Sequence, residues 1–311
     1  MTLAPLPRRQ ALTVLTGIGA IVASLPPAAQ AAPQAKPAPS RRPAAIVARD
    51  GTRLYFRDWG EGRPLVFLAG WGLGSESWAY QAAALSEEGL RCVSYDRRGH
   101  GRSDAPGTGY DYDTLADDLA AVLEQLDLRD VVLVAHSMAG GEVVRYFTRH
   151  GGARVAKVVL LAPMNPCPTR KADNPDGFPA EAFEQYRRKV LMRDYPKWAR
   201  DNLDPFFTPE TSPDLKEWVL RLSLETTAKA QVECNRTSTG ADLRPEIPRI
   251  KVPVLVIQGD KDASTRLETS GRRYAEALPN AELIVYAGAP HGLMYTHTER
   301  LNADILKFAK S

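Results

Sequence analysis

The chain has 311 residues, of which 44% are hydrophobic and 25% charged, a composition typical of a soluble globular protein. That length allows one large domain, or one domain with an inserted subdomain. The formal net charge is only +3, from 40 basic and 37 acidic residues, and no basic run lies outside the N-terminal tail, so we expect no nucleic-acid partner.

The first 31 residues have the pattern of a signal peptide. Arg8 and Arg9 precede an apolar run over residues 11–25, and residues 29–31 (AQA) match a cleavage site. The paired arginines resemble a twin-arginine export signal. The apolar run is shorter than the ~20 residues that span a bilayer, which favours a cleaved signal over a retained anchor. We expect an exported protein, periplasmic or extracellular, without stable membrane association after cleavage.

Residues 32–43 are rich in proline and alanine and predict a disordered linker, so the folded domain is expected over residues 44–311. The folded domain contains three cysteines, and an odd number of this size permits at most one intramolecular pair. Either Cys167 and Cys234 form a disulfide, or these two and Cys92 are all free thiols. No cysteine or histidine cluster has the spacing of a metal site.

From residue 44 the pattern alternates between strands and helices. Two strands flank Asp50-Gly51, a hairpin signal, and cover residues 45–48 and 54–59. Further strands are predicted over residues 64–69, 91–95, 131–135 and 157–161. Helices are predicted over residues 77–88, after Asp111 to about 126, and over 138–150.

Between about residues 162 and 248 the strands stop. Helical stretches that carry aromatic residues are predicted over 180–192, 195–202 and 215–228. Strands over 252–258 and 283–286 and helices over 268–277 and 298–310 complete the chain.

This order predicts an α/β fold with a mostly parallel central sheet and helices on both faces. The opening hairpin is expected to add antiparallel strands at one edge of the sheet. The helical block at about residues 165–245 is interpreted as an inserted cap. Its aromatic side chains fit a core and a substrate pocket equally well: Trp198, Phe206, Phe207 and Trp218.

Ser137 follows the strand over residues 131–135, and small residues and a helix come directly after it. This is the setting of a nucleophile elbow, a sharp strand-to-helix turn that exposes a serine hydroxyl above a sheet. The usual motif is G-x-S-x-G, and here Ala135 and Ala139 occupy both glycine positions. The alternative is a serine that only caps an ordinary helix.

Partners for Ser137 follow in the chain order Ser…Asp…His that this elbow requires. A strand ends near Asp260 and Asp262, and His291 lies in a loop after the next strand. A serine hydroxyl needs a base, so His291 is expected to accept its proton while a carboxylate orients the imidazole. Asp262 is favoured over Asp260, which is placed to cap the turn. The remaining histidines are interpreted as structural: His100, His136, His150 and His297.

An oxyanion hole needs two backbone N–H donors that point at the developing negative charge. Met138, the residue after Ser137, is expected to supply one of them. The glycine-rich loop over residues 70–74 is expected to supply the other, with Trp71 as the candidate.

Five further segments carry a family resemblance. Residues 95–104 (YDRRGHGRSD) are similar to the D-x-R-G-x-G-x-S turn of the α/β-hydrolase superfamily, where the aspartate and arginines brace the loops around the nucleophile. Residues 110–115 (YDYDTL), 140–143 (GGEV), 174–177 (NPDG) and 290–293 (PHGL) resemble the cofactor-free (non-haem) haloperoxidase/arylesterase branch. The resemblance extends from about residue 45 to the C-terminus.

The resemblance implies an α/β-hydrolase fold and a serine hydrolase that cleaves a small ester or lactone through an acyl-serine, with no metal or other cofactor. It implies Ser137, Asp262 and His291 as the triad, and Trp71 and Met138 as the oxyanion hole. Perhydrolase activity, which makes peracids from a carboxylic acid and peroxide, is the alternative. A non-hydrolytic lyase reaction of the same triad is less favoured. A non-enzymatic ligand-binding relative is also less favoured, because such relatives commonly lose a triad member and here the Ser…Asp…His order is intact.

Three features depart from the family pattern. Ala69 stands where the family has histidine, so we expect the oxyanion loop to lose a bracing side chain. The methyl groups of Ala135 and Ala139 are expected to narrow the pocket near Ser137. Residues 263–265 (AST) replace a Val-Pro pair after the acid. The acyl and alcohol specificity and the oligomeric state stay open.

Overall fold

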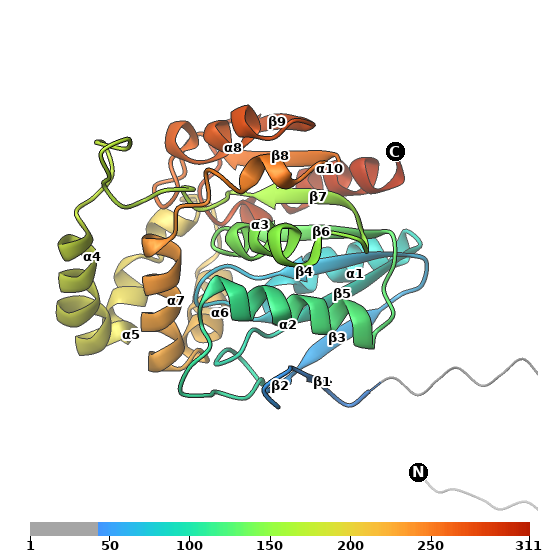
Figure 1. Cartoon of the computed structure of the whole chain (residues 1–311), viewed down its shortest axis with the longest axis horizontal. Helices are drawn as coiled ribbons and strands as arrows, with labels where there is room; N and C mark the ends of the chain where they lie inside the picture. The colour runs from blue at the N-terminus through green and yellow to red at the C-terminus, as the bar shows by residue number, and fades with distance from the viewer. Residues whose placement is uncertain (1–42) are drawn as a thin grey trace, which may run out of the picture. The chain divides into compact units, whose positions relative to one another are not determined.

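A seven-stranded sheet organises residues 43–311, the part of the chain that the structure, a computed structural model, describes (Figure 1). Its strands are β3 (Phe56–Trp59), β4 (Arg63–Leu68), β5 (Leu90–Tyr95), β6 (Val131–His136), β7 (Val155–Leu161), β8 (Val254–Gly259) and β9 (Ala281–Tyr286). Their order is β3-β5-β4-β6-β7-β8-β9, and every neighbouring pair except β3 and β5 is parallel. The predicted mostly parallel sheet is confirmed.

The predicted signal peptide, residues 1–31, lies outside the described residues. So does the predicted linker, residues 32–43, apart from its last residue, Pro43. Both therefore stay predictions.

The N-terminal hairpin forms a small sheet of its own. β1 (Ile46–Val47) and β2 (Arg53–Leu54) pair antiparallel with each other, and only β3 joins the main sheet as an antiparallel edge. The expectation that both hairpin strands extend the main sheet is wrong. The loop after β5 accepts hydrogen bonds from the backbone at β2 and just after it. The Arg53 N–H donates to the side chain of Asp104, and the Tyr55 N–H donates to the side chain of Ser103.

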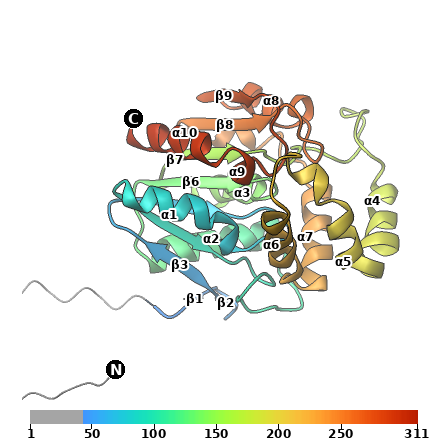
Figure 2. The same ribbon diagram turned by 180° about the vertical axis from the view of Figure 1, so that it is seen from behind.

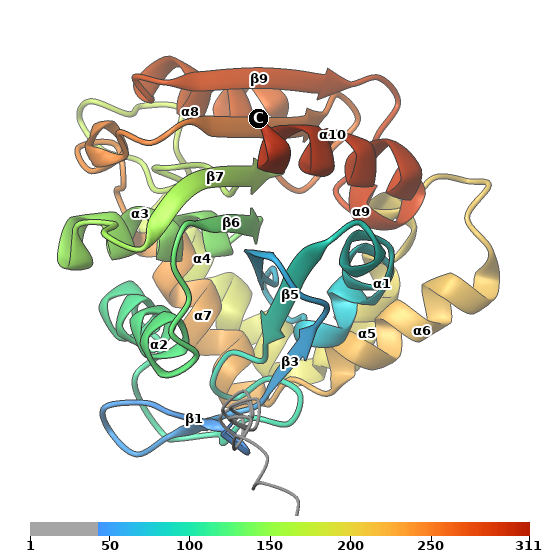
Figure 3. The same ribbon diagram turned by 90° about the vertical axis from the view of Figure 1, so that its right-hand side faces the viewer.

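Helices cover both faces of the sheet, as predicted. One face packs against α2 (Tyr112–Gln125), α3 (Ala139–His150) and α8 (Gly271–Ala277). The opposite face packs against α1 (Ala79–Glu87) and α10 (Thr298–Lys310), which lie in front of the sheet in Figure 2. Figure 3 shows the sheet between α2 and α3 on one side and α1 and α10 on the other.

Alternate strand residues enter two separate buried clusters. In β4, Val66 and Leu68 belong to the cluster that contains α2 and α3, whereas Leu65 and Phe67 belong to the cluster that contains α1 and α10. Burying one such side chain stabilises the fold by about 1.5–3 kcal/mol. Both faces of the strand are covered, which explains why its sequence is a continuous apolar run.

A block of helices separates β7 from β8. Its members are α4 (Ala180–Tyr186), a π-helical turn (Arg187–Leu191), α5 (Met192–Asp201), α6 (Pro213–Leu224) and α7 (Ala228–Gly240). Figure 1 shows this block beside the carboxyl end of β7. We refer to these helices as the cap helices. A short helix, α9 (Leu293–Thr296), precedes α10.

Helix α7 does not follow from the sequence pattern. The predicted helix over residues 215–228 ends at Leu224 in the structure, and α7 begins only at Ala228. Several of the residues that α7 buries are polar, so its sequence lacks an apolar helical period: Gln231, Asn235, Ser238 and Thr239. The one local signal is Thr227, whose side chain accepts a hydrogen bond from the Ala230 N–H at 3.3 Å and caps the helix.

The cysteines within the described chain are unpaired. Cys92, Cys167 and Cys234 are all free and buried, so the alternative of three free thiols holds. None of the helices between residues 43 and 311 has the length and apolar character needed to cross a membrane.

Asp111 caps α2 and provides a test of local stability. Its carboxylate accepts hydrogen bonds from the N–H and the hydroxyl of Thr114, at 2.9 and 3.0 Å. Burial acts to raise the pKa of Asp111, but the hydrogen bonds from Thr114 outweigh it and hold the pKa below 3.8. We expect Asp111→Ala to lower the free energy of unfolding by about 1 kcal/mol at pH 7.

The lowered pKa sets the pH dependence of this effect. The stabilisation is complete above the ordinary pKa of 3.8 and disappears as the pH falls through the lower folded-state value. Urea unfolding at pH 7 and pH 3 measures the difference in unfolding free energy between the wild type and Asp111→Ala. Asp111→Asn is the control, because asparagine caps a helix but does not titrate. A difference between wild type and Asp111→Ala that is as large at pH 3 as at pH 7 contradicts the prediction.

Candidate active site

Ser137 lies in the sharp turn between β6 and α3. Its φ angle is +55°, in the left-handed region that residues other than glycine rarely adopt. Three backbone hydrogen bonds hold the turn. The Ser137 N–H donates to the carbonyl of Leu161 at 2.9 Å, and the N–H groups of Gly140 and Met164 both donate to the carbonyl of Ser137 at 3.1 Å. The backbone therefore has the strained geometry expected of a nucleophile elbow.

Close packing around α3 supports this turn. The ring of Tyr112 occupies the space that a Cβ on Gly141 would fill, and its hydroxyl donates to the carbonyl of Met138 at 3.1 Å. Ala135 and Ala139 are fully buried in the core cluster, and neither lines the cavity beside Ser137. The expectation that their methyl groups narrow this cavity is wrong, because both residues pack into the core.

Three side chains from three loops form one hydrogen-bonded row. His291 Nε2 lies 3.0 Å from Ser137 Oγ, and His291 Nδ1 lies 2.7 Å from Asp262 Oδ2. The three residues follow β6, β8 and β9, and the carboxyl ends of parallel strands meet at one edge of a sheet. The structure thus brings together the predicted nucleophile, base and acid.

Asp262 is surrounded by hydrogen-bond donors. The backbone N–H groups of Ser264 and Thr265 donate to Oδ1, both at 2.8 Å. The Gln258 amide and the Thr265 hydroxyl donate to Oδ2, both at 2.9 Å. Burial acts to raise the pKa of Asp262, but His291 and the two hydrogen bonds from Thr265 lower it below its usual value. Asp262 is therefore held as an anion that can stabilise a protonated His291.

The other acid and the neighbouring histidine have structural contacts. Asp260 accepts a hydrogen bond from the Gly288 N–H at 2.7 Å, which is the turn-capping position expected of it. His136 packs beside His291 with ring centroids 4.7 Å apart, and its Nε2 lies 3.2 Å from the His291 carbonyl. Burial and the adjacent His291 lower the pKa of His136 to about 3, so it is neutral at pH 7.

Trp71 and Met138, the residues predicted to form the oxyanion hole, line the same cavity as Ser137 and His291. Within residues 43–311, neither of their backbone N–H groups donates a hydrogen bond, so both donors are available to a ligand. Gly70 brings the loop against the nucleophile turn. A Cβ at Gly70 would lie 2.6 Å from His136 Nδ1 and 3.4 Å from Ser137 Cβ.

A buried arginine braces the loop that carries Trp71. The Arg97 guanidinium donates to the carbonyls of Ala69 and Gly70, at 2.7 and 3.4 Å, and to Glu142 on α3, at 2.8 Å. Arg97 and Glu142 are 4% and 1% exposed, so this ion pair is shielded from water. The loop is therefore braced through its main chain, although Ala69 brings no hydrogen-bonding side chain.

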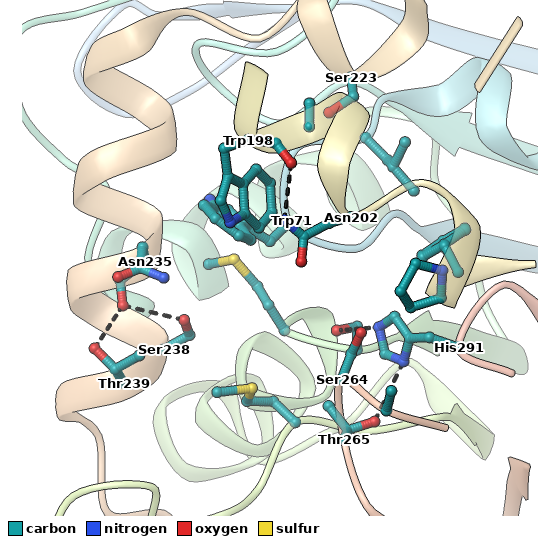
Figure 4. A pocket seen from close by; sticks show the side chains of 18 of the residues that line it. Trp71, Trp198, Asn202, Ser223, Asn235, Ser238, Thr239, Ser264, Thr265 and His291 are labelled. Atoms are coloured by element: carbon teal, nitrogen blue, oxygen red, sulfur yellow. Dashed lines mark hydrogen bonds between the residues drawn. The ribbon is translucent and has the colours of Figure 1, made fainter. Parts of the chain in front are cut away.

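A cavity of about 610 Å³ lies over Ser137 and His291 (Figure 4). The sequence did not decide which aromatic residues of the helical block belong to the core and which to a substrate pocket. Of these, Trp198 and Phe206 line this cavity. Phe207 is buried in the core, and Trp218 packs against the same core cluster without lining the cavity. Trp71 connects the oxyanion loop to the cap helices, since its Nε1 donates to the carbonyl of Gln231 at 2.9 Å.

Some of the residues that hold Asp262 and Trp71 were not predicted from the sequence. Gln258 is a polar residue at the end of the apolar strand β8, and that position is the signal that could have identified it. Thr265 lies only three residues after Asp262, so its closeness to the acid was a local signal that could have identified it. Gln231 carries no comparable signal, because its contact with Trp71 joins segments that are distant in the chain.

Comparison with known proteins shows similarity over most of the described chain. A family model described as alpha/beta hydrolase fold matches residues 63–298. A non-heme chloroperoxidase from Kitasatospora aureofaciens is 39% identical over 267 residues, which cover 84% of this chain and 97% of that protein. A bifunctional esterase/perhydrolase from Acinetobacter calcoaceticus is 35% identical over 274 residues, which cover 86% of this chain and 99% of that protein.

Comparison with solved structures also shows similarity over most of the described chain. An esterase from Exiguobacterium antarcticum superposes with a TM-score of 0.82 at 32% sequence identity, covering 86% of this chain and 99% of that chain. The residues matched by the family model, 63–298, include the candidate site, the cap helices and every strand of the main sheet except β3.

Gly70 tests the position of the oxyanion loop. In Gly70→Ala the new methyl group must displace His136 or the loop, which moves the Trp71 N–H relative to Ser137. A displacement of about 1 Å at a reacting centre can lower the rate by about 10²-fold, so we expect slower reaction at Ser137. The rate at which a fluorophosphonate labels Ser137 measures the effect.

Gly107→Ala is the matched control, because nothing lies within 4 Å of a Cβ there. We expect it to label at the wild-type rate. Equal labelling rates for Gly70→Ala and Gly107→Ala argue against a tight contact between the loop and the nucleophile turn.

The Arg97–Glu142 pair gives a second test, of stability. Glu142→Gln leaves the Arg97 charge buried without its ionic partner, and breaking a buried pair in this way costs about 3–5 kcal/mol of unfolding free energy. The exposed pair Lys197–Asp201 is the control, because Asp201→Asn removes a contact that is worth about 0–1 kcal/mol. Urea unfolding that finds the two variants equally stable would rule out a structural role for the buried pair.

Proposed function

Because this chain belongs to the α/β-hydrolase fold family, in its non-haem haloperoxidase branch, we propose that it hydrolyses small carboxylic esters or lactones through an acyl-serine intermediate. The chain is an enzyme with the predicted α/β-hydrolase fold. The observation that carries the proposal is the hydrogen-bonded row Ser137–His291–Asp262 beside the two free N–H donors of Trp71 and Met138.

Acylation begins with the serine hydroxyl. His291 Nε2, 3.0 Å from Ser137 Oγ, removes the hydroxyl proton as the oxygen attacks the carbonyl carbon of the ester. Asp262 keeps the proton on His291 Nδ1 and stabilises the imidazolium that forms. The N–H groups of Trp71 and Met138 bind the negative oxygen of the tetrahedral intermediate. The imidazolium then protonates the leaving alcohol, and the acyl group stays on Ser137.

Deacylation uses the same groups in the reverse order. His291 removes a proton from a water molecule, and the resulting hydroxide attacks the acyl-serine carbonyl. The second tetrahedral intermediate collapses, the proton returns to Ser137 Oγ, and the carboxylic acid leaves. The substrate carbonyl must reach Ser137 through the cavity, whose lining is largely apolar. This lining favours esters with an apolar chain over charged substrates.

Perhydrolysis is the second candidate, favoured by the similarity to proteins named chloroperoxidase and esterase/perhydrolase. In this reaction hydrogen peroxide replaces water in the deacylation step, so the acyl group leaves as a peracid. Halide oxidation that requires both peroxide and a carboxylic acid supports this activity. Halide oxidation that persists without a carboxylic acid contradicts a peracid route.

Ser137→Ala tests the proposed nucleophile. Alanine keeps the Cβ and the backbone conformation of serine, so we expect a folded protein with the wild-type melting temperature. Ester hydrolysis is expected to fall by about 10³-fold or more, and fluorophosphonate labelling to disappear. Asp262→Asn should lower kcat by about 10⁴-fold, because the amide cannot stabilise the imidazolium or fix its tautomer.

The assay is release of p-nitrophenol from short-chain p-nitrophenyl esters. Ser86→Ala, which removes a hydroxyl that bonds only to its own helix, is the control and should match the wild type. If Ser137→Ala retains hydrolysis within tenfold of the wild type, Ser137 is not the nucleophile.

A further inference from the structure

The cavity over Ser137 has a polar wall on the side away from His291. Asn235, Ser238 and Thr239 line it from one face of α7, and Figure 4 shows them across the cavity from His291. We refer to these three residues as the α7 polar patch. They are 8%, 5% and 4% exposed, so their polar groups are almost fully withdrawn from solvent. Polar groups in such a place are costly unless they bind something.

Arg187 fixes the direction of the Asn235 amide. The buried guanidinium of Arg187 is a donor only, and its Nη1 lies 3.2 Å from Asn235 Oδ1 and 3.0 Å from Thr239 Oγ1. The amide oxygen must therefore face Arg187, and the amide nitrogen faces the other way. In Figure 4 this nitrogen points into the cavity. It donates no hydrogen bond to any residue within 43–311.

The hydroxyl groups of the patch use their own protons within the helix. Ser238 and Thr239 both donate to the carbonyl of Asn235, at 3.2 and 2.8 Å. The Asn235 amide is therefore the hydrogen-bond donor that the α7 polar patch offers to the cavity. Its natural ligand is an oxygen acceptor.

Charge decides which kind of acceptor fits. Among the described residues that line the cavity there is no aspartate, glutamate, lysine or arginine. Arg187 lies behind the patch and is paired with Glu184 at 3.1 Å. A carboxylate at the patch would lose its water without gaining a counter-ion on the cavity surface, so a neutral oxygen is favoured.

Most of the residues that line the cavity besides the α7 polar patch are apolar or aromatic. Met138, Met164 and Tyr186 line the cavity together with Trp198 and Leu220. A ligand that reaches from Ser137 to Asn235 must therefore carry an apolar segment in its middle.

We propose that the α7 polar patch is a specificity subsite for esters or lactones that carry a neutral oxygen acceptor, such as a ketone, ether or hydroxyl group, beyond an apolar segment. This inference rests on the proposed hydrolase function and adds the substrate class to it. Asn235 is the residue that distinguishes such substrates from plain aliphatic esters.

Matched substrate pairs test the subsite. One series compares p-nitrophenyl octanoate with its mono-oxo derivatives, with the ketone at successive positions of the acyl chain. A second series compares octyl acetate with the corresponding oxo-octyl acetates, so that either half of the ester can reach Asn235. We expect one oxo position to have a kcat/KM about 2- to 12-fold above its parent ester, as one hydrogen bond allows.

Two variants of Asn235 isolate the donor. Asn235→Leu removes the amide and should abolish the oxo preference. Asn235→Asp keeps an oxygen for Arg187 but replaces the donor with a second acceptor, so a folded protein should now disfavour the same oxo ester. Ser223→Ala is the control, because Ser223 lines the same cavity but is hydrogen-bonded to Tyr195. Ser223→Ala should keep the wild-type ratio of kcat/KM for the oxo ester to kcat/KM for its parent ester.

The outcomes separate this inference from the proposed function. If the wild type hydrolyses the parent esters but gives the same oxo-to-parent ratio as Asn235→Asp in both series, the subsite is overturned and the hydrolase stands. If the wild type hydrolyses no ester and Ser137 resists the fluorophosphonate, the proposed function itself fails.

Discussion

The left-handed backbone at Ser137 is the constraint on which the rest of the site depends. A φ angle of +55° at a residue with a Cβ costs about 1–3 kcal/mol, and it persists only where the surroundings determine it. Here the neighbouring strand supplies an acceptor for the Ser137 N–H, and α3 packs so closely that Tyr112 fills the space beside Gly141. The turn that results lifts the hydroxyl out of the sheet and into reach of His291.

The carboxyl edge of the sheet then gathers the remaining groups from loops that are far apart in the chain. Such loops need braces, because short contacts at the site leave little tolerance for movement. Arg97 supplies one brace by joining the main chain of the oxyanion loop to Glu142 on α3. Gln258 and Thr265 supply another by surrounding Asp262 with donors. Each brace is buried, which makes its hydrogen bonds stronger and its loss more costly.

The sequence predicted what is encoded locally. Continuous apolar runs marked the strands that are buried on both faces, and the elbow around Ser137 was recognisable from a strand, a serine and small residues. The sequence did not predict α7, because its inner face is polar where a helix usually carries apolar residues. It also misplaced Ala135 and Ala139, whose side chains face the core rather than the cavity. Which side of an element a residue faces depends on packing with distant segments, which local pattern does not contain.

Helix α7 contacts both the oxyanion loop and the substrate cavity. Gln231 and Asn235 are four residues apart, so they lie on the same side of the helix, one turn from each other. The carbonyl of Gln231 receives the Trp71 indole N–H, and the amide of Asn235 faces the cavity. Helix α7 thus connects the side of the cavity that Asn235 lines with the loop that carries an oxyanion donor. If substrate binds Asn235, that contact acts on the helix that positions Trp71, and binding energy from a remote part of the substrate can support the transition state instead of only tightening binding.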